Sequence, residues 1–147
     1  MSNMESHFDK PMRSNLPLQI LIYFNWWFNS AYLAVSVLLF TFKAYKFYYP
    51  RGMLIWEAIM LVLYLVVEIS RLSQLTRGNK LETIDPMAKA FVLGLITILS
   101  YAYFLRLQTY VLYVEVVLNS IGICFVGSEV IFGLFASYQF LVDQQGY

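Results

Sequence analysis

Five ionisable side chains stand inside or at the edges of long apolar stretches, where charges are rare. They are Glu57, Glu68, Arg71, Glu115 and Glu129. If these stretches lie in lipid, each charge costs about 2.5 kcal/mol or more, so it should face a partner. Carboxylates in such surroundings could relay protons, act as an acid–base couple, or form ion pairs that join helices.

The sequence offers little that would turn these carboxylates into a catalytic or metal site. Its one histidine, His7, lies in the polar amino-terminal segment, and its one cysteine, Cys124, lies in an apolar run. A single cysteine can form neither an intrachain disulfide nor a thiolate metal cluster. No nucleophile or phosphate-binding loop accompanies the carboxylates. We therefore expect no enzymatic activity, no metal and no cofactor.

The composition indicates that lipid, and not water, surrounds most of the chain. Of its 147 residues, 60% are hydrophobic and only 13% are charged. A soluble domain carries roughly a quarter charged residues, so this chain could not cover its apolar surface in water. A net charge of +1 gives no general basic character, which argues against nucleic acid as a partner.

Four apolar stretches are long enough to cross a bilayer core of about 30 Å, which takes about twenty helical residues. The spans are expected at residues 18–42, 53–72, 87–107 and 111–142, with a polar loop at 73–86 and a short turn at 108–110. Residues 1–17 and 143–147 are expected to be tails. The predicted fold class is an all-α membrane protein, with four transmembrane helices in an antiparallel bundle over residues 18–142.

Positive charges predict the orientation of the bundle. Six of them fall on the side of the two termini, and four on the opposite side. The first group is Lys10, Arg13, Arg71, Arg77, Lys80 and Lys89; the second is Lys43, Lys46, Arg51 and Arg106. This modest excess favours cytoplasmic termini.

Polar and small residues in three of the spans recur at intervals of three and four, which places each set on one helix face. Such residues let helices approach closely and form hydrogen bonds between them, so these faces should line the bundle interior. The three sets are Asn25, Asn29, Tyr32 and Ser36; Glu57, Leu61, Tyr64, Glu68 and Arg71; and Glu115, Asn119, Gly122, Val126, Glu129, Gly133 and Ala136.

A rise of about 1.5 Å per residue sorts the charges by depth. Glu68, Arg71 and Glu129 should form an inner layer towards the cytoplasm. An outer layer should contain Glu57, Arg106 and Glu115. Each layer then holds two carboxylates and one guanidinium. The carboxylate left without a basic partner would be protonated or would meet a charge on another protein.

Two main interpretations of the inner layer remain open. In the first, Arg71 bridges two helices and the charges hold the bundle together. In the second, Glu68 and Glu129 serve a small proton-coupled carrier. We favour the first, because so small a bundle leaves little room for a lumen and lacks the broken helices and inverted repeats of carriers. A membrane enzyme is a third and weaker alternative.

The polar loop is the best candidate for docking a partner, because it is the longest polar segment. The candidate partner-binding residues in this loop are Arg77, Gly78, Asn79 and Lys80.

Several short motifs, taken in order, resemble the transmembrane-17 family of ciliary transition-zone tetraspan proteins. The carboxyl-terminal part has LQTYVL at residues 107–112, then Glu115-Val116, Asn119 and Gly127-Ser128-Glu129. The second span and the following loop have Leu63-Tyr64-Leu65, Glu68, Arg71-Leu72 and Thr76-Arg77-Gly78-Asn79. The first span adds Phe24-Asn25, Trp27, Asn29 and Ala31-Tyr32. No single motif is diagnostic, but their order and spacing extend over most of the chain.

This resemblance implies a non-enzymatic, multi-pass membrane protein of the ciliary transition zone. Members of the family act in the Meckel-syndrome module, with tectonics, meckelin-type receptors and B9-domain proteins as partners. That complex supports cilium assembly and limits diffusion between the plasma membrane and the ciliary membrane. The resemblance therefore implies a location in the ciliary membrane at the base of the cilium.

Overall fold

The computed structural model describes residues 15–146 as four long helices joined by short linkers. The helices are α1 (Leu16–Lys46), α2 (Met53–Leu81), α3 (Ile84–Arg106) and α4 (Tyr113–Gln145). Each is long and apolar enough to cross a membrane. No strand occurs within residues 15–146. The predicted all-α fold with four transmembrane helices is confirmed.

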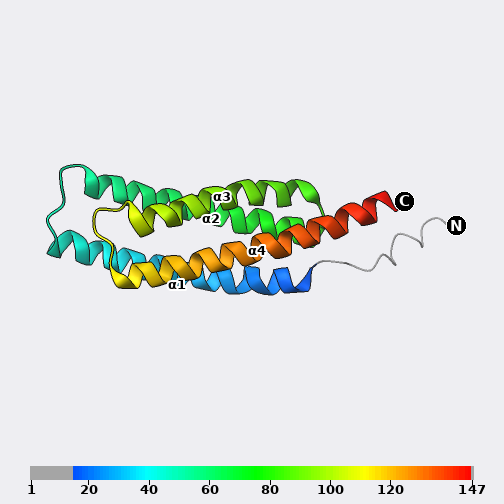
Figure 1. Ribbon diagram of the computed structural model, residues 1–147, viewed down its shortest axis with the longest axis horizontal. Coiled ribbons are helices and arrows are strands. Elements are labelled where there is room, and N and C mark those ends of the chain that lie inside the picture. The colour runs from blue at the N-terminus through cyan, green and yellow to red at the C-terminus, as the bar shows by residue number, and fades with distance from the viewer. Residues whose placement is uncertain (1–14, 147) are drawn as a thin grey trace.

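The helices run up and down in an antiparallel bundle (Figure 1). Each helix packs against its neighbours in the order α1, α2, α3, α4 and back to α1, while α2 also touches α4 across the centre. The start of α1, the α2–α3 turn and the end of α4 lie at one end, hereafter the α2–α3 end. The α1–α2 and α3–α4 linkers lie together at the opposite end.

The first and last helices, α1 and α4, extend beyond the predicted spans towards the ends of the chain. Asn15 caps α1, because its side-chain Oδ1 accepts a hydrogen bond of 3.1 Å from the backbone N–H of Leu18. Pro17 fits in the first helical turn, where a backbone N–H is not needed. Residues 16–17 and 143–145, predicted as tails, are therefore helical. Residues 1–14 of the predicted tail, and residue 147, lie outside the described part of the chain.

The predicted loop at residues 73–86 is wrong. α2 continues to Leu81 and α3 begins at Ile84, so only two residues connect them. The helix persists because Leu72, Leu75 and Asn79 remain buried at intervals of three and four, which keeps one face packed against the bundle. Glu82, with a φ of 53°, takes the left-handed conformation that ends α2.

Buried residues form two clusters along the bundle axis. The cluster near the α2–α3 end is aliphatic except for one ring, and contains Leu18, Ile22, Leu72, Leu75, Met87, Ala90, Ala136 and Phe140. The second is mostly aromatic, and contains Tyr32, Tyr64, Tyr101, Phe104 and Val126. The outer surface is apolar as well: Trp27 is 65% exposed and Leu38 is 70% exposed, as expected for side chains that face lipid.

Candidate functional site: a buried ion-pair network

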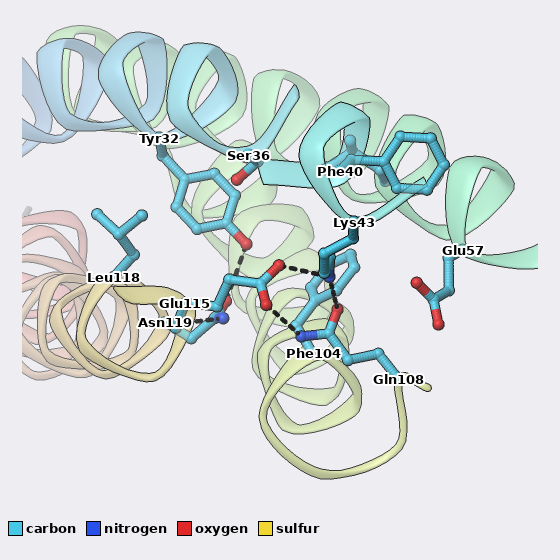
Figure 2. A pocket seen from close by; sticks show the side chains of 11 residues that line it. Tyr32, Ser36, Phe40, Lys43, Glu57, Phe104, Gln108, Glu115, Leu118 and Asn119 are labelled. Carbon is cyan, nitrogen blue, oxygen red and sulfur yellow. Dashed lines mark hydrogen bonds and ion pairs between the residues drawn. The ribbon is translucent and has the colours of Figure 1, made fainter. Parts of the chain in front are cut away.

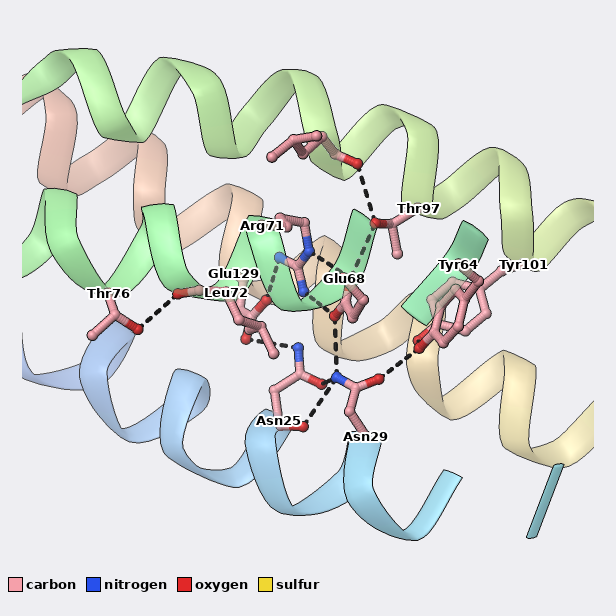
Figure 3. A network of polar contacts seen from close by, with 11 residues as sticks. Asn25, Asn29, Tyr64, Glu68, Arg71, Leu72, Thr76, Thr97, Tyr101 and Glu129 are labelled. Carbon is pink, nitrogen blue, oxygen red and sulfur yellow. Dashed lines mark hydrogen bonds and ion pairs between the residues drawn. The ribbon is translucent and has the colours of Figure 1, made fainter. Parts of the chain in front are cut away.

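Arg71 lies at the centre of the bundle and bridges α2 to α4 (Figure 3). Its Nε donates to Glu68 Oε2 at 2.9 Å, and one terminal nitrogen donates to Glu68 Oε1 at 2.6 Å. The other terminal nitrogen donates to Glu129 Oε2 at 2.6 Å. All three residues are at most 1% exposed. The three residues of the predicted inner layer therefore form an ion-pair triad. We call this triad, together with its polar neighbours Asn25, Asn29 and Thr97, the Arg71 cluster.

Those neighbours come from the two remaining helices. Asn25 of α1 donates to Glu129 Oε1 at 2.9 Å, and Asn29 donates to Glu68 Oε1 at 3.1 Å. Thr97 of α3 donates its hydroxyl to Glu68 Oε2 at 3.0 Å. The Arg71 cluster therefore includes a side chain from every helix. Its polar groups can be satisfied in these positions only when all four helices are packed together.

The cluster accounts for the carboxylate that the sequence leaves without a basic partner in the inner layer. One guanidinium serves both carboxylates, and every carboxylate oxygen accepts at least one hydrogen bond. Two acids and one base still carry a formal charge of −1 if both acids are ionised. The amide and hydroxyl donors of α1 and α3 disperse that charge, as buried ion pairs require.

A second polar centre lies towards the opposite end and is built around Lys43 (Figure 2). The Nζ of Lys43, on α1, donates to Glu115 Oε1 at 2.7 Å and to the Tyr110 carbonyl at 3.1 Å. Gln108 donates to Glu115 Oε2 at 3.1 Å, and so does the Leu112 backbone N–H at 2.9 Å. Glu115 thus caps the start of α4 and ties it to α1. We refer to Lys43, Gln108 and Glu115 as the Lys43 cluster.

Glu57 is buried beside this cluster but has no cation partner among the described residues. Its two oxygens instead accept from the Thr109 backbone N–H at 2.6 Å and from the Tyr49 hydroxyl at 3.0 Å. Desolvation and the hydrogen bond to Glu57 raise the pKa of Tyr49 above its ordinary value, so the hydroxyl stays a donor over a wider pH range. Glu57 therefore fixes the two linkers at this end to each other.

The predicted outer layer is only partly correct. Glu57 and Glu115 do lie at the same end, but Arg106 is exposed and forms no ion pair with any residue in the described range. Lys43 supplies the positive charge instead. Lys43 falls just outside the predicted first span, residues 18–42, yet α1 continues to Lys46 and turns Lys43 inwards, where it is 1% exposed.

Polar residues also line α3, where no stripe was predicted. Thr97 donates to Glu68. The hydroxyls of Tyr101 and Tyr64 lie 2.8 Å apart, and the Tyr64 hydroxyl also donates to Asn29 Oδ1. On α4, Asn119 accepts a hydrogen bond of 2.8 Å from the Tyr32 hydroxyl. A spacing of three and four was visible in the sequence at Ala90, Gly94, Thr97, Tyr101, Phe104 and Gln108.

The four residues proposed for partner docking do not form one exposed loop. Arg77 and Lys80 are exposed on α2, but Gly78 and Asn79 are buried. Asn79 accepts from the Asn15 backbone N–H at 3.0 Å and donates to the Asn15 carbonyl at 3.1 Å, which holds the start of α1. Gly78 faces Met87 so closely that a Cβ would lie 2.6 Å from the Met87 Cγ. Two of the four positions therefore serve packing.

The space between these polar groups is small. A cavity of about 20 Å³ lies beside Lys43, Glu57 and Asn119, large enough for one water molecule. The described residues contain no group of three or more His, Cys, Asp or Glu side chains that could hold a metal ion. What the arrangement can do is join helices, because Glu68, Glu115 and Glu129 already accept hydrogen bonds from side chains of other helices.

The Lys43 cluster can be tested by removing its cation. Lys43→Ala should lower the free energy of unfolding by about 1.5 kcal/mol, because Glu115 loses a charged donor but keeps those of Gln108 and Leu112. Thermal unfolding of the purified protein in detergent would measure this loss. Lys46→Ala, an exposed lysine in the same helical turn, is the matched control. Equal effects of the two substitutions would contradict the assignment.

The fold and these clusters define a polytopic membrane protein whose helices are joined by buried ion pairs. A family model for predicted membrane proteins, Transmemb_17, matches residues 20–126. The chain belongs to this family.

Named relatives cover most of the chain. Transmembrane protein 216 of Homo sapiens is 36% identical over 118 residues, which make up 80% of this chain and 81% of the human protein. That of Danio rerio is 35% identical over 134 residues, or 90% of this chain and 83% of the fish protein. No solved structure matches the chain.

Proposed function

We propose that this protein is a non-enzymatic, multi-pass subunit of the ciliary transition-zone complex, where it supports cilium assembly and the membrane diffusion barrier. The observation that carries the proposal is its 36% identity to human transmembrane protein 216 over 80% of the chain. Its partners would be tectonics, meckelin-type receptors and B9-domain proteins, as the family resemblance implies. It would reside in the ciliary membrane at the base of the cilium.

The geometry of the network supports a structural role over that of a carrier. The oxygens of Glu68 and Glu129 are held by Arg71, Asn25, Asn29 and Thr97, so a proton or ion would have to displace several of these contacts to bind. The cavity beside Lys43 holds about one water molecule and is no lumen.

Cytoplasmic termini remain part of the proposal. Four spans place both ends of the chain on the same side of the membrane. Arg71 and Lys43 are buried in ion pairs, which leaves three exposed cations at each end of the described bundle. They are Arg77, Lys80 and Lys89 at the α2–α3 end, and Lys46, Arg51 and Arg106 at the other. The bias towards cytoplasmic termini therefore depends on Lys10 and Arg13.

Localisation of a tagged copy in ciliated cells tests the proposed function. The tag should concentrate at the ciliary base and should be reached by antibody only after the plasma membrane is permeabilised. A uniform plasma-membrane signal would overturn the ciliary assignment. The carrier alternative predicts instead that Glu129→Gln assembles normally in reconstituted vesicles while abolishing a proton flux seen with the unmodified protein.

A further inference from the structure

An open groove of about 450 Å³ lies on the lipid-facing side of the bundle, between α2 and α3. Gln74 forms its α2 wall, and Ala88, Lys89, Val92 and Leu93 form its α3 wall. The volume falls in the range of small-molecule sites, and most of the lining is apolar. Lys89 forms no ion pair with any residue between 15 and 146, although the exposed Asp85 is only one helical turn away.

The depth of the groove matches the boundary between lipid tails and headgroups. α3 has 23 residues and is thus about 35 Å long, only slightly longer than a hydrocarbon core of about 30 Å. Lys89 lies five residues after the start of α3 at Ile84. Helical side chains lean towards the amino-terminal end of their helix, so the ammonium of Lys89 is directed to the headgroup level.

The exposed charges around the groove are Lys89 and Asp85 of α3 and Arg77 of α2, which sum to +1, and the floor of the groove is apolar. Arg77 follows Gln74 by three residues on α2 and is exposed, so it adds a second cation on the same side of the helix. Val92 and Leu93 lie one turn deeper than Lys89, where a lipid tail would run. Two other grooves lack this combination: one contains Asp143 as its charged residue, and the other is uncharged.

We propose that this groove binds an anionic glycerophospholipid, with the phosphate at Lys89 and Arg77 and an acyl chain along Val92 and Leu93. Basic pockets between transmembrane helices select acidic headgroups in this way. The inference goes beyond the ciliary assignment and does not depend on it, since the binding can be measured without cells.

Native mass spectrometry of the full-length protein would test the proposed lipid binding. The protein would first be exchanged into micelles that contain phosphatidylglycerol or phosphatidylcholine with the same acyl chains. Retention of phosphatidylglycerol should exceed that of phosphatidylcholine. Lys89→Gln should lower the retention of phosphatidylglycerol about five-fold, because one cation near anionic headgroups contributes about 1 kcal/mol of binding free energy. Lys46→Gln, an exposed lysine at the opposite end, should leave it unchanged. Val92→Trp, which fills the groove, should lower retention of both lipids.

Equal retention of the two lipids, or unchanged retention in Lys89→Gln, would overturn the proposal. A Val92→Trp variant that keeps its lipid but loses a co-purifying membrane protein would also overturn it, in favour of a partner helix in the groove. Unfolding temperatures of each variant in lipid-free detergent should match the unmodified protein, because the substituted side chains face outwards. A lipid effect accompanied by global unfolding would count against a local site.

Discussion

Replacement of Arg71 by alanine should lower the free energy of unfolding by about 3–5 kcal/mol, the largest loss we expect from any single substitution. Removal of the guanidinium leaves Glu68 and Glu129 buried, at most 1% exposed, with no positive charge beside them. Neither can regain water without opening the bundle. The loss would appear as a lower unfolding temperature in detergent and a smaller yield of monodisperse protein.

Arg106→Ala provides the control for this experiment. Arg106 is also an arginine on a transmembrane helix, but it is exposed and outside both clusters. Its replacement should change stability by no more than about 0.5 kcal/mol, as for other surface substitutions. If both alanine variants unfold at the same temperature, Arg71 does not have the role assigned to it here.

Gly122→Ala should destabilise the bundle by about 2–3 kcal/mol, although only one methyl group is added. A Cβ at this position would overlap the Tyr101 ring at its hydroxyl end. Tyr101 is 0% exposed, and its hydroxyl lies 2.8 Å from that of Tyr64, so the ring has little freedom to move aside. Thermal unfolding in detergent would measure the effect.

Gly127→Ala is the matched control on the same helix. A Cβ there would meet no atom within 4 Å, so the side chain has free space. Alanine is also the better helix former by about 1 kcal/mol, so this variant should be neutral or slightly more stable. A loss at Gly127 equal to that at Gly122 would contradict the assignment of the Gly122 effect to its close contact with Tyr101 of α3.

The sequence was sufficient to predict the interior face of α4. Asn119, Gly122, Val126, Glu129, Gly133 and Ala136, which were selected by their spacing alone, are all buried. Helical periodicity is reliable here because small and polar residues on an otherwise apolar helix have no reason to face lipid. The same argument placed Glu68 and Arg71 in that interior, and the structure has the Arg71 bridge of the favoured interpretation, with Glu129 of α4 as its partner.

Lys43 was missed because its position next to a polar linker suggested an interfacial residue. Its partner Glu115 is 72 residues away, so nothing local indicated the pair. A signal did exist: Lys43 follows Ser36 by seven residues and continues the polar face of α1.

The length of α2 was missed for a related reason. Hydropathy falls after Leu72, but the helical spacing of buried residues continues to Asn79.

The pairing of Lys43 with Glu115 is therefore the part of the site that spacing could not supply. A helical face fixes the direction in which a side chain points, but not which of three neighbours it meets. The choice of Lys43 over Arg106 for Glu115 depends on where α1 ends and on the path of the α3–α4 linker, which are properties of the assembled bundle.

A double-mutant cycle between Arg71 and Glu129 tests the central claim most directly, since that claim is that one buried ion pair joins α2 to α4. Unfolding temperatures would be compared for Arg71→Ala, Glu129→Gln and the double variant. Removal of Glu129 from the Arg71→Ala background also removes an unpaired buried carboxylate, so the double variant should be no less stable than Arg71→Ala alone. Losses that simply add would contradict the bridge.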